Sequence, residues 1–299
     1  MENKKFFDDD LFLSSPDSFR IYDAVKNLPI IDYHCHLDQK MIKNDSELGD
    51  IGELWLKSDH YKWRAMRLCG VDEKYITGDA SYFEKFLEYA SIMPKLAGGP
   101  LYYWTHLELR QIFGINEPLN SESARRIYEN ANEVAKKLSV SDLLKLYRVE
   151  YIATTDDPCD SLEDHGIYGG VRVAPTFRPD KVFSFDREYL DKLGRAAGCE
   201  IDSFVSLCNA LESRIDYFVS HGCRVSDHGF AFFPDYYPDS DEAEELFSRR
   251  GKLNAGERSA LFGALLTRLC RMYAKRGMIM QLHCSVMRNV NPEMFDVCG

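Results

Sequence analysis

The sequence has little positive charge: 37 lysines and arginines stand against 48 aspartates and glutamates, for a formal net charge of −11. No long cluster of lysine or arginine offsets this balance. Because binding to a phosphate backbone depends on a basic surface, we expect no nucleic-acid partner. Local arginines can still bind an anionic small molecule, so the net charge leaves that class of ligand open.

The sequence also lacks a long apolar run and any Cys-x-x-Cys pair. No stretch approaches the roughly 20 apolar residues of a membrane-spanning helix, and the polar first ten residues do not resemble a secretory signal. The nine cysteines are dispersed singly, which is typical of a reducing compartment and argues against a zinc ribbon or a redox pair. We therefore expect a cytoplasmic protein with no membrane partner.

What the sequence does contain is an alternation of short apolar runs and amphipathic segments, which predicts an α/β fold with a parallel sheet and helical crossovers. Strands are predicted at 29–37, 149–155, 171–177, 223–227 and 278–283. Crossover helices are predicted at 200–221 and 256–276, ending at Gly222 and Gly277. Between the first two strands, only helices are predicted, at about 47–57, 60–68, 80–93, 121–138 and 141–147. The expected division is 1–39 for the lead-in and first strand, 40–148 for a helical insertion, and 149–299 for the remaining strands.

The first predicted strand ends in a His-x-His pair, His34 and His36. Alternate residues of a strand share a face, so both imidazoles would point the same way, roughly 7 Å apart. Neutral imidazole is a common ligand of divalent transition metals. Short motifs of this kind arise by chance, and on its own the pair is better interpreted as ordinary strand-end histidines.

Polar side chains follow every predicted strand, and this changes the interpretation of the histidine pair. In parallel α/β sheets, ligands bind at the carboxyl ends of the strands. Each residue alone could be a helix cap or a turn former, but their concentration at successive strand ends favours a metal or catalytic site. The residues concerned are His34, His36, Asp156, Asp157, Arg178, Asp227, His228, His283 and Arg288.

Several longer motifs resemble the uronate (glucuronate) isomerase family of the amidohydrolase superfamily. They begin with the IDYHCHL segment around His34 and WLKSDHYKWRAMR at 55–67, and they extend to about residue 291. The others are YWTHLEL at 103–109, TTDDP at 154–158, RPD at 178–180, GCRVSDH at 222–228, and Arg288-Asn289 after His283.

The resemblance implies aldose–ketose isomerisation of a hexuronate, D-glucuronate to D-fructuronate or D-galacturonate to D-tagaturonate, through an enediol. It implies a divalent metal, expected to be Zn²⁺ although its need for turnover stays open, held by His34 and His36. Tyr61, Asp227 and His283 are the expected catalytic residues, and Arg178 and Arg288 would bind substrate oxygens. Tyr61 and Asp227 could instead be a core residue and a helix cap, and Arg178 could pair locally with Asp180. Homo-oligomerisation is left open.

The family fold is a (β/α)8 TIM barrel, whereas five strands are predicted here. We therefore expect an incomplete barrel, the N-terminal portion of a longer isomerase, that is poorly stable and nearly inactive alone because its edge strands are unpaired. Two alternatives stay open: a metal-dependent hydrolase of the same superfamily, and a non-catalytic fragment. The hydrolase is disfavoured because Asp227 stands where a carbamylated lysine would be needed.

Overall fold

The computed structural model describes residues 6–284 and 292–298, which divide into two compact units. The first unit contains residues 1–30 and 44–148, and the second contains residues 31–43 and 149–299. The sequence-based division kept residues 1–39 together, whereas in the structure the lead-in up to residue 30 packs with the helical insertion. Among the described residues, no helix is both long and apolar enough to cross a membrane.

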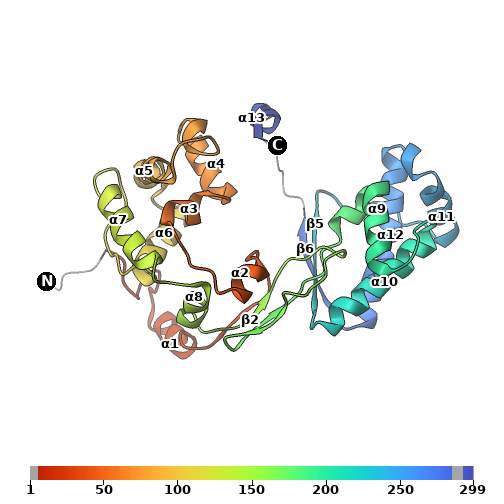
Figure 1. The fold of residues 1–299 in the computed structure, drawn as a ribbon, viewed down its shortest axis with the longest axis horizontal. Helices are drawn as coiled ribbons and strands as arrows, with labels where there is room; N and C mark the ends of the chain where they lie inside the picture. Colours follow the sequence, from red (N-terminus) through yellow and green to blue (C-terminus); the bar gives the residue numbers. More distant parts are fainter. Residues whose placement is uncertain (1–5, 285–291, 299) are drawn as a thin grey trace. The chain divides into compact units, whose positions relative to one another are not determined.

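The first unit is helical (Figure 1). Its own core contains the buried side chains of Trp55, Met66, Phe86 and Tyr89. The helices are α1 (Pro16–Val25), α3 (Ile51–Leu56), α4 (His60–Leu68), α5 (Tyr82–Ile92), α6 (Pro100–Gln111), α7 (Ala124–Ala135) and α8 (Val140–Leu146), with 3-10 turns η1 (Glu73–Tyr75) and η2 (Met93–Leu96). A helical insertion was predicted, and α4 has the predicted bounds. Helices α5 and α7 are preceded by Ser81 and Ser123.

The start of α4 is set by Asp59, whose carboxylate accepts hydrogen bonds from the backbone N–H groups of Tyr61 and Lys62 at 2.9 and 3.1 Å. A side-chain acceptor at this position satisfies backbone donors that have no partner inside the helix. The buried ammonium of Lys62 also donates to Asp59, at 2.7 Å. This end of α4 is therefore fixed by one carboxylate, and Tyr61 projects from its first turn.

The second unit is built on strands and crossover helices (Figure 1). The strands are β1 (Ile30–Asp32), β2 (Val149–Ala153), β3 (Gly166–Tyr168), β4 (Val171–Ala174), β5 (Val225–Phe230) and β6 (Ile279–Cys284). The helices are α2 (Gln39–Lys43), α9 (Arg187–Ala197), α10 (Phe204–Ser220), α11 (Ser240–Ser248), α12 (Ala255–Lys275) and α13 (Pro292–Cys298), with 3-10 turns η3 (Asp180–Ser184) and η4 (Arg250–Lys252).

The strands form one sheet in the order β1-β2-β4-β3 and a second pair, β5-β6. Strands β2 and β4 are parallel, as are β5 and β6, whereas β3 pairs antiparallel to β4 in a hairpin. Beyond the end of β4, Phe177 makes single parallel bridges to Asp156 on one side and to Ser226 on the other. These bridges connect the two sheets, so the carboxyl ends of β2, β4 and β5 lie along one edge.

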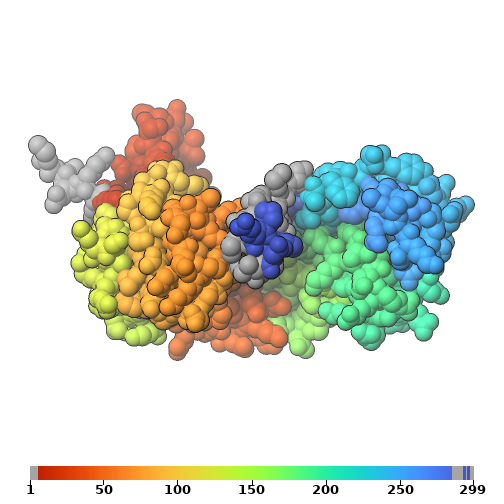
Figure 2. All heavy atoms as spheres, turned by 90° about the horizontal axis from the view of Figure 1, so that it is seen from above, coloured from red at the N-terminus to blue at the C-terminus, as the bar shows by residue number. Residues whose placement is uncertain are grey.

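The core of this unit lies between the sheet and helices α9 to α12, and includes Phe177, Phe218, Leu265 and Tyr273. Figure 2 shows these helices, green to blue, packed as one body. The apolar positions of α10 and α12 recur at three- and four-residue spacing, which buries one face of each helix against the strands. Both helices are followed by a glycine with positive φ, Gly222 at 95° and Gly277 at 62°, as predicted.

Some elements differ from the predictions. Helices α6, α9 and α11 and the β3–β4 hairpin were not predicted. The first strand is shorter than predicted: β1 ends at Asp32 rather than at residue 37, so the His-x-His pair lies in the loop that follows it. The predicted alternation of His34 and His36 along one strand face is therefore wrong. Arg288, a predicted substrate ligand, lies outside the described residues.

Candidate active site

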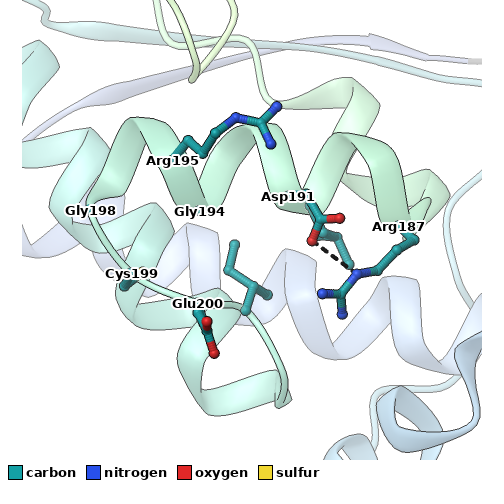
Figure 3. A pocket seen from close by; sticks show the side chains of 9 residues that line it. Arg187, Asp191, Gly194, Arg195, Gly198, Cys199 and Glu200 are labelled. Carbon is teal, nitrogen blue, oxygen red and sulfur yellow. Dashed lines mark ion pairs between the residues drawn. The ribbon is translucent and has the colours of Figure 1, made fainter.

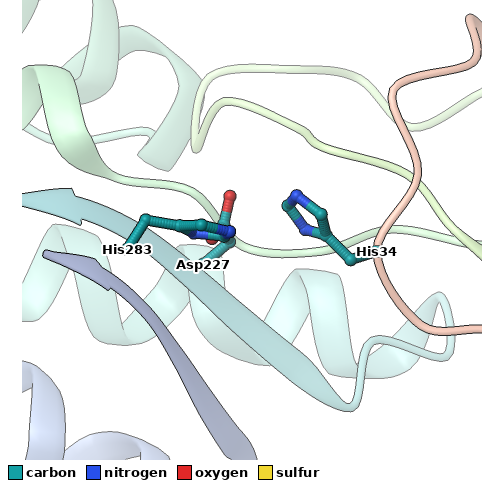
Figure 4. A group of neighbouring side chains, drawn as sticks. All are labelled: His34, Asp227 and His283. Atoms are coloured by element: carbon teal, nitrogen blue, oxygen red, sulfur yellow. The ribbon is translucent and has the colours of Figure 1, made fainter. Parts of the chain in front are cut away.

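A hollow and a cluster of reactive side chains lie at separate places in the described part of the second unit. A shallow hollow of about 660 Å³ runs along α9 and contains the surface ion pair of Arg187 with Asp191, 2.9 Å apart (Figure 3). None of the predicted site residues that the structure describes lines it. The reactive side chains instead gather around the carboxyl ends of the strands, where His34, Asp227 and His283 meet (Figure 4).

Asp227 and His283 are brought together by the pairing of β5 with β6. Gly229 lies opposite His283 in the parallel register, and Asp227 is two residues before Gly229. Side chains two apart in a strand share a face, so Asp227 and His283 project to the same side. His283 Nδ1 lies 2.8 Å from Asp227 Oδ1. Asp227 is fully buried, whereas the His283 side chain is about half exposed.

His34 completes this group from the loop after β1. The potential ligand atoms of His34, Asp227 and His283 all lie within 4.8 Å of one another. His34 Nδ1 and both Asp227 oxygens are buried and make no hydrogen bond of acceptable geometry, even though His283 and Arg178 lie within ion-pairing distance of the carboxylate. Two imidazoles and a carboxylate with unsatisfied buried atoms are a donor set that fits a divalent transition metal.

His36 lies beside this group rather than within it. Its ring packs edge-on against that of His34, with centroids 4.9 Å apart. Burial lowers the pKa of His36, and the nearby His34 and Arg178 lower it further, against the opposing effect of Asp227. The lowered pKa favours the neutral imidazole, which is the form that can bind a metal.

Arg178 borders the group from the segment after β4. Its Nη1 lies 3.0 Å from Asp227 Oδ2, and its Nε lies 3.1 Å from Asp180 Oδ2. Burial alone would raise the pKa of Asp180, but His228, the Gly229 N–H and Arg178 outweigh it and hold the pKa below its usual range. The guanidinium therefore lies between the carboxylates of Asp180 and Asp227 and keeps about a quarter of its side chain exposed.

Tyr61 belongs to the other compact unit, on the first turn of α4. Its side chain is 59% exposed and its ring lies against that of His60, with centroids 4.2 Å apart. The structural alternative considered for Tyr61, a core residue, is therefore wrong.

Comparisons with known proteins identify the family of the chain. The family model for glucuronate isomerase matches residues 3–299. The chain is 41% identical to the uronate isomerase of Caldicellulosiruptor saccharolyticus and 40% identical to that of Clostridium perfringens, over 99% of its own length and 67% of theirs.

The chain belongs to the glucuronate isomerase family. Its fold agrees with this assignment. It resembles the crystal structure of the Thermotoga maritima uronate isomerase with a TM-score of 0.94 and 33% identity, covering 99% of this chain and 68% of that one. It also resembles the crystal structure of the Caulobacter crescentus glucuronate isomerase, with a TM-score of 0.88 and 26% identity, covering 98% of this chain and 66% of that one. This glucuronate isomerase chain thus spans about two thirds of the length of the relatives it matches.

Sequence reasoning missed part of what surrounds the isomerase site. Asp156 was interpreted as a turn former, but it is a buried partner of His165, whose Nε2 lies 3.3 Å from Asp156 Oδ1. The Asp156 carboxylate also accepts from the Thr154 hydroxyl at 2.7 Å and the Thr176 N–H at 3.0 Å. Asp180 was considered only as a local partner of Arg178, and its bond to the distant Gly229 has no signal in the local sequence.

Proposed function

We propose that the group around His34 is the active site of a uronate isomerase, which interconverts D-glucuronate with D-fructuronate and D-galacturonate with D-tagaturonate. The observation that carries this proposal is the meeting of His34, Asp227 and His283 at the strand ends, with Arg178 beside them, in a chain of the glucuronate isomerase family. An enzyme for a hexuronate needs polarising groups for a carbonyl and a cation for a carboxylate, and this site offers both.

We propose His34, Asp227 and His283 as the residues that hold a divalent metal, expected to be Zn²⁺, with His36 as a further neutral imidazole beside them. When bound, such an ion polarises a carbonyl oxygen and so stabilises the negative charge of an enediolate. The donor types, nitrogen and carboxylate oxygen, suit zinc. The ring edge of His36 against His34 restricts the orientation that His34 can take.

The isomerisation moves one proton from C2 to C1 of the sugar and leaves its composition unchanged. A base removes the C2 proton while the aldehyde oxygen is protonated, giving the enediol; loss of the O2 proton and delivery of a proton to C1 then give the ketose. We propose Asp227 and Tyr61 for these transfers, because a carboxylate and a phenol can each exchange a proton within hydrogen-bond reach. His283, whose Nδ1 lies 2.8 Å from Asp227 Oδ1, is proposed as the third residue of this catalytic group.

Arg178 is proposed to bind an oxygen of the hexuronate through the exposed part of its guanidinium, and Arg288 is proposed for a second oxygen. Arginine is suited to this role because its planar fork can donate two hydrogen bonds to one carboxylate. We also propose that the strands β1, β2, β4, β5 and β6 form part of a (β/α)8 barrel. The single bridges of Phe177, which continue the sheet from β4 to β5, support that arrangement.

The test is an assay for ketose formation from D-glucuronate and D-galacturonate, run together with metal analysis of the purified protein. Because the relatives are longer, it is performed with the chain alone and with the last third of the Caldicellulosiruptor relative supplied as a second polypeptide. Ketose formation that is lost in His34→Ala supports the proposal. Hydrolysis of uronate lactones, esters or amides without ketose formation would instead favour the hydrolase alternative.

A further inference from the structure

The guanidinium of Arg178 is held between two carboxylates that reach it from different parts of the chain. Its Nη1 lies 3.0 Å from Oδ2 of Asp227, which is fully buried. Its Nε lies 3.1 Å from Oδ2 of Asp180, two residues further along. A guanidinium that is hydrogen-bonded to one carboxylate and ion-paired with another samples fewer orientations than a free arginine side chain.

Asp180 is itself fixed by strand β5. The backbone N–H of Gly229 donates to Asp180 Oδ2 at 2.9 Å, and Nδ1 of the buried His228 lies 3.5 Å from Asp180 Oδ1. A bond to a backbone donor on a strand is more restrictive than a bond to a flexible side chain. Asp180 therefore links Arg178 to the same strand that carries Asp227.

Gly229 contributes through its lack of a side chain. A Cβ at this position would lie 3.0 Å from Arg178 Nη2 and 3.3 Å from Asp180 Oδ2. Both contacts are closer than a methyl group normally approaches a nitrogen or an oxygen, so the guanidinium or the carboxylate would have to move. The glycine thus leaves the guanidinium and the carboxylate in place, whereas a larger residue would displace one of them.

We propose that Asp180 and Gly229 are positioning residues that fix the guanidinium of Arg178 for binding the hexuronate; we call this pair the Arg178 clamp. The inference deepens the proposed function and rests on it for the identity of the ligand. A simple local ion pair at this exposure contributes little to stability. The clamp differs because it connects Arg178 through Asp180 to Gly229 of β5, in addition to the ion pair of Arg178 with Asp227 on the same strand. Neither residue touches the reacting atoms in this role.

The test is a double-mutant cycle on binding of D-glucuronate, measured by calorimetry. Asp180→Asn removes the charge but keeps an oxygen for the Gly229 N–H, and Gly229→Ala adds the crowding Cβ. Each is expected to raise the Kd about tenfold. In an Arg178→Ala background, neither substitution should weaken binding further, because the residue that they position is gone.

Two matched variants control for the type of substitution. Gly251→Ala adds a Cβ where no atom lies within 4 Å, and Asp191→Asn removes the surface partner of Arg187. Both should leave the Kd unchanged. The proposal is overturned if Asp180→Asn leaves the Kd unchanged, or if it weakens binding equally with and without Arg178.

A second measurement needs no uronate and so separates failure of the clamp from failure of the proposed function. In thermal unfolding, Asp180→Asn should lower the midpoint when Arg178 is present. In the Arg178→Ala background, Asp180→Asn should raise the midpoint. The carboxylates of Asp180 and Asp227 then lack the cation between them, and the substitution removes one of the two. Equal lowering in both backgrounds would refute the clamp. If the parent protein binds no D-glucuronate, the proposed function fails, and this cycle alone decides on the clamp.

Discussion

The imidazole rings of His34 and His283 lie with their centroids 4.8 Å apart, tilted by 38°, although one residue follows β1 and the other lies on β6. The first and last strands of the described part of the chain thus contribute to one group. Two imidazoles at this separation, next to a buried carboxylate, have their donor atoms in reach of a single ion.

We predict that His34→Ala lowers the affinity for Zn²⁺ or Co²⁺ by at least about tenfold, because it removes one of three donors. The measurement is equilibrium dialysis with metal analysis, supported by the visible spectrum of the Co²⁺ form. His221→Ala is the control, since His221 bonds to the backbone of its own helix at Tyr217. Unchanged affinity in His34→Ala would remove the metal from the proposal.

A second prediction concerns His106, which is buried in the helical unit. Its Nδ1 donates to the Tyr102 carbonyl at 2.7 Å, so its Nε2 accepts from the Leu119 N–H at 2.9 Å. Burial lowers the pKa of His106, against the opposing effect of the Tyr102 carbonyl. Between the lowered folded pKa and the ordinary value of about 6.5, the unfolded chain binds more protons than the folded one.

The stability contributed by neutral His106 is therefore complete above about pH 6.5 and is lost as the pH falls toward the folded pKa. We expect urea unfolding midpoints that decrease from pH 7.5 to pH 5, and His106→Gln should flatten that dependence. Other groups also titrate in acid. The measurement is therefore the difference between the parent protein and His106→Gln in the slope of the unfolding midpoint against pH. Identical slopes would show that His106 does not contribute.

The third prediction concerns Asp156 and His165, whose paired side chains are 1% and 2% exposed. Removing the Asp156 carboxylate leaves the buried polar groups around it without their acceptor, and each such group costs about 1–3 kcal/mol. We expect Asp156→Ala to lower the free energy of unfolding by about 3 kcal/mol, because the Thr154 hydroxyl and the Thr176 N–H also lose their acceptor.

Chemical denaturation followed by circular dichroism measures this effect. Asp191→Ala, which breaks an exposed pair, should cost no more than about 0.5 kcal/mol. A loss below 1 kcal/mol in Asp156→Ala would mean that solvent compensates the buried partners and that the pair is not structurally important.

Much of the fold could be predicted because it depends on patterns that the local sequence carries. The parallel strands, the helical insertion and the glycine stops of α10 and α12 follow from periodicity and capping. Helix α6 was missed, and its first residue is Pro100, which follows Gly99. Proline is well suited to that position, since its missing N–H would have no partner there.

The site was predicted in its residue types but not in its arrangement. His34, Asp227, His283 and Arg178 were identified because polar residues at strand ends gather along one edge. The position of His34 in a loop depends on where β1 stops pairing with β2, and no residue between Asp32 and His34 marks that point. Asp180 and Gly229 are connected through a bond between distant segments, and such contacts are fixed by tertiary packing alone.

The last prediction concerns the exposed apolar residues of β6. Among the described residues this strand pairs with β5 alone, and Ile279 at its start is 66% exposed. An unpaired strand edge with apolar side chains is a template for pairing with another chain. Ile279→Lys should therefore reduce aggregation of the 299-residue polypeptide by at least about twofold, since a charge on an edge strand opposes such pairing. The aggregation rate is measured by light scattering at a fixed protein concentration.

Val205→Lys is the matched control for this substitution. Val205 is 59% exposed, but it lies on helix α10, whose backbone bonds are made within the helix. The same change from an apolar side chain to lysine alters the net charge equally and touches no strand edge. If both variants slow aggregation to the same extent, the added charge is responsible; if only Ile279→Lys does, the free edge of β6 is the surface through which the chains associate.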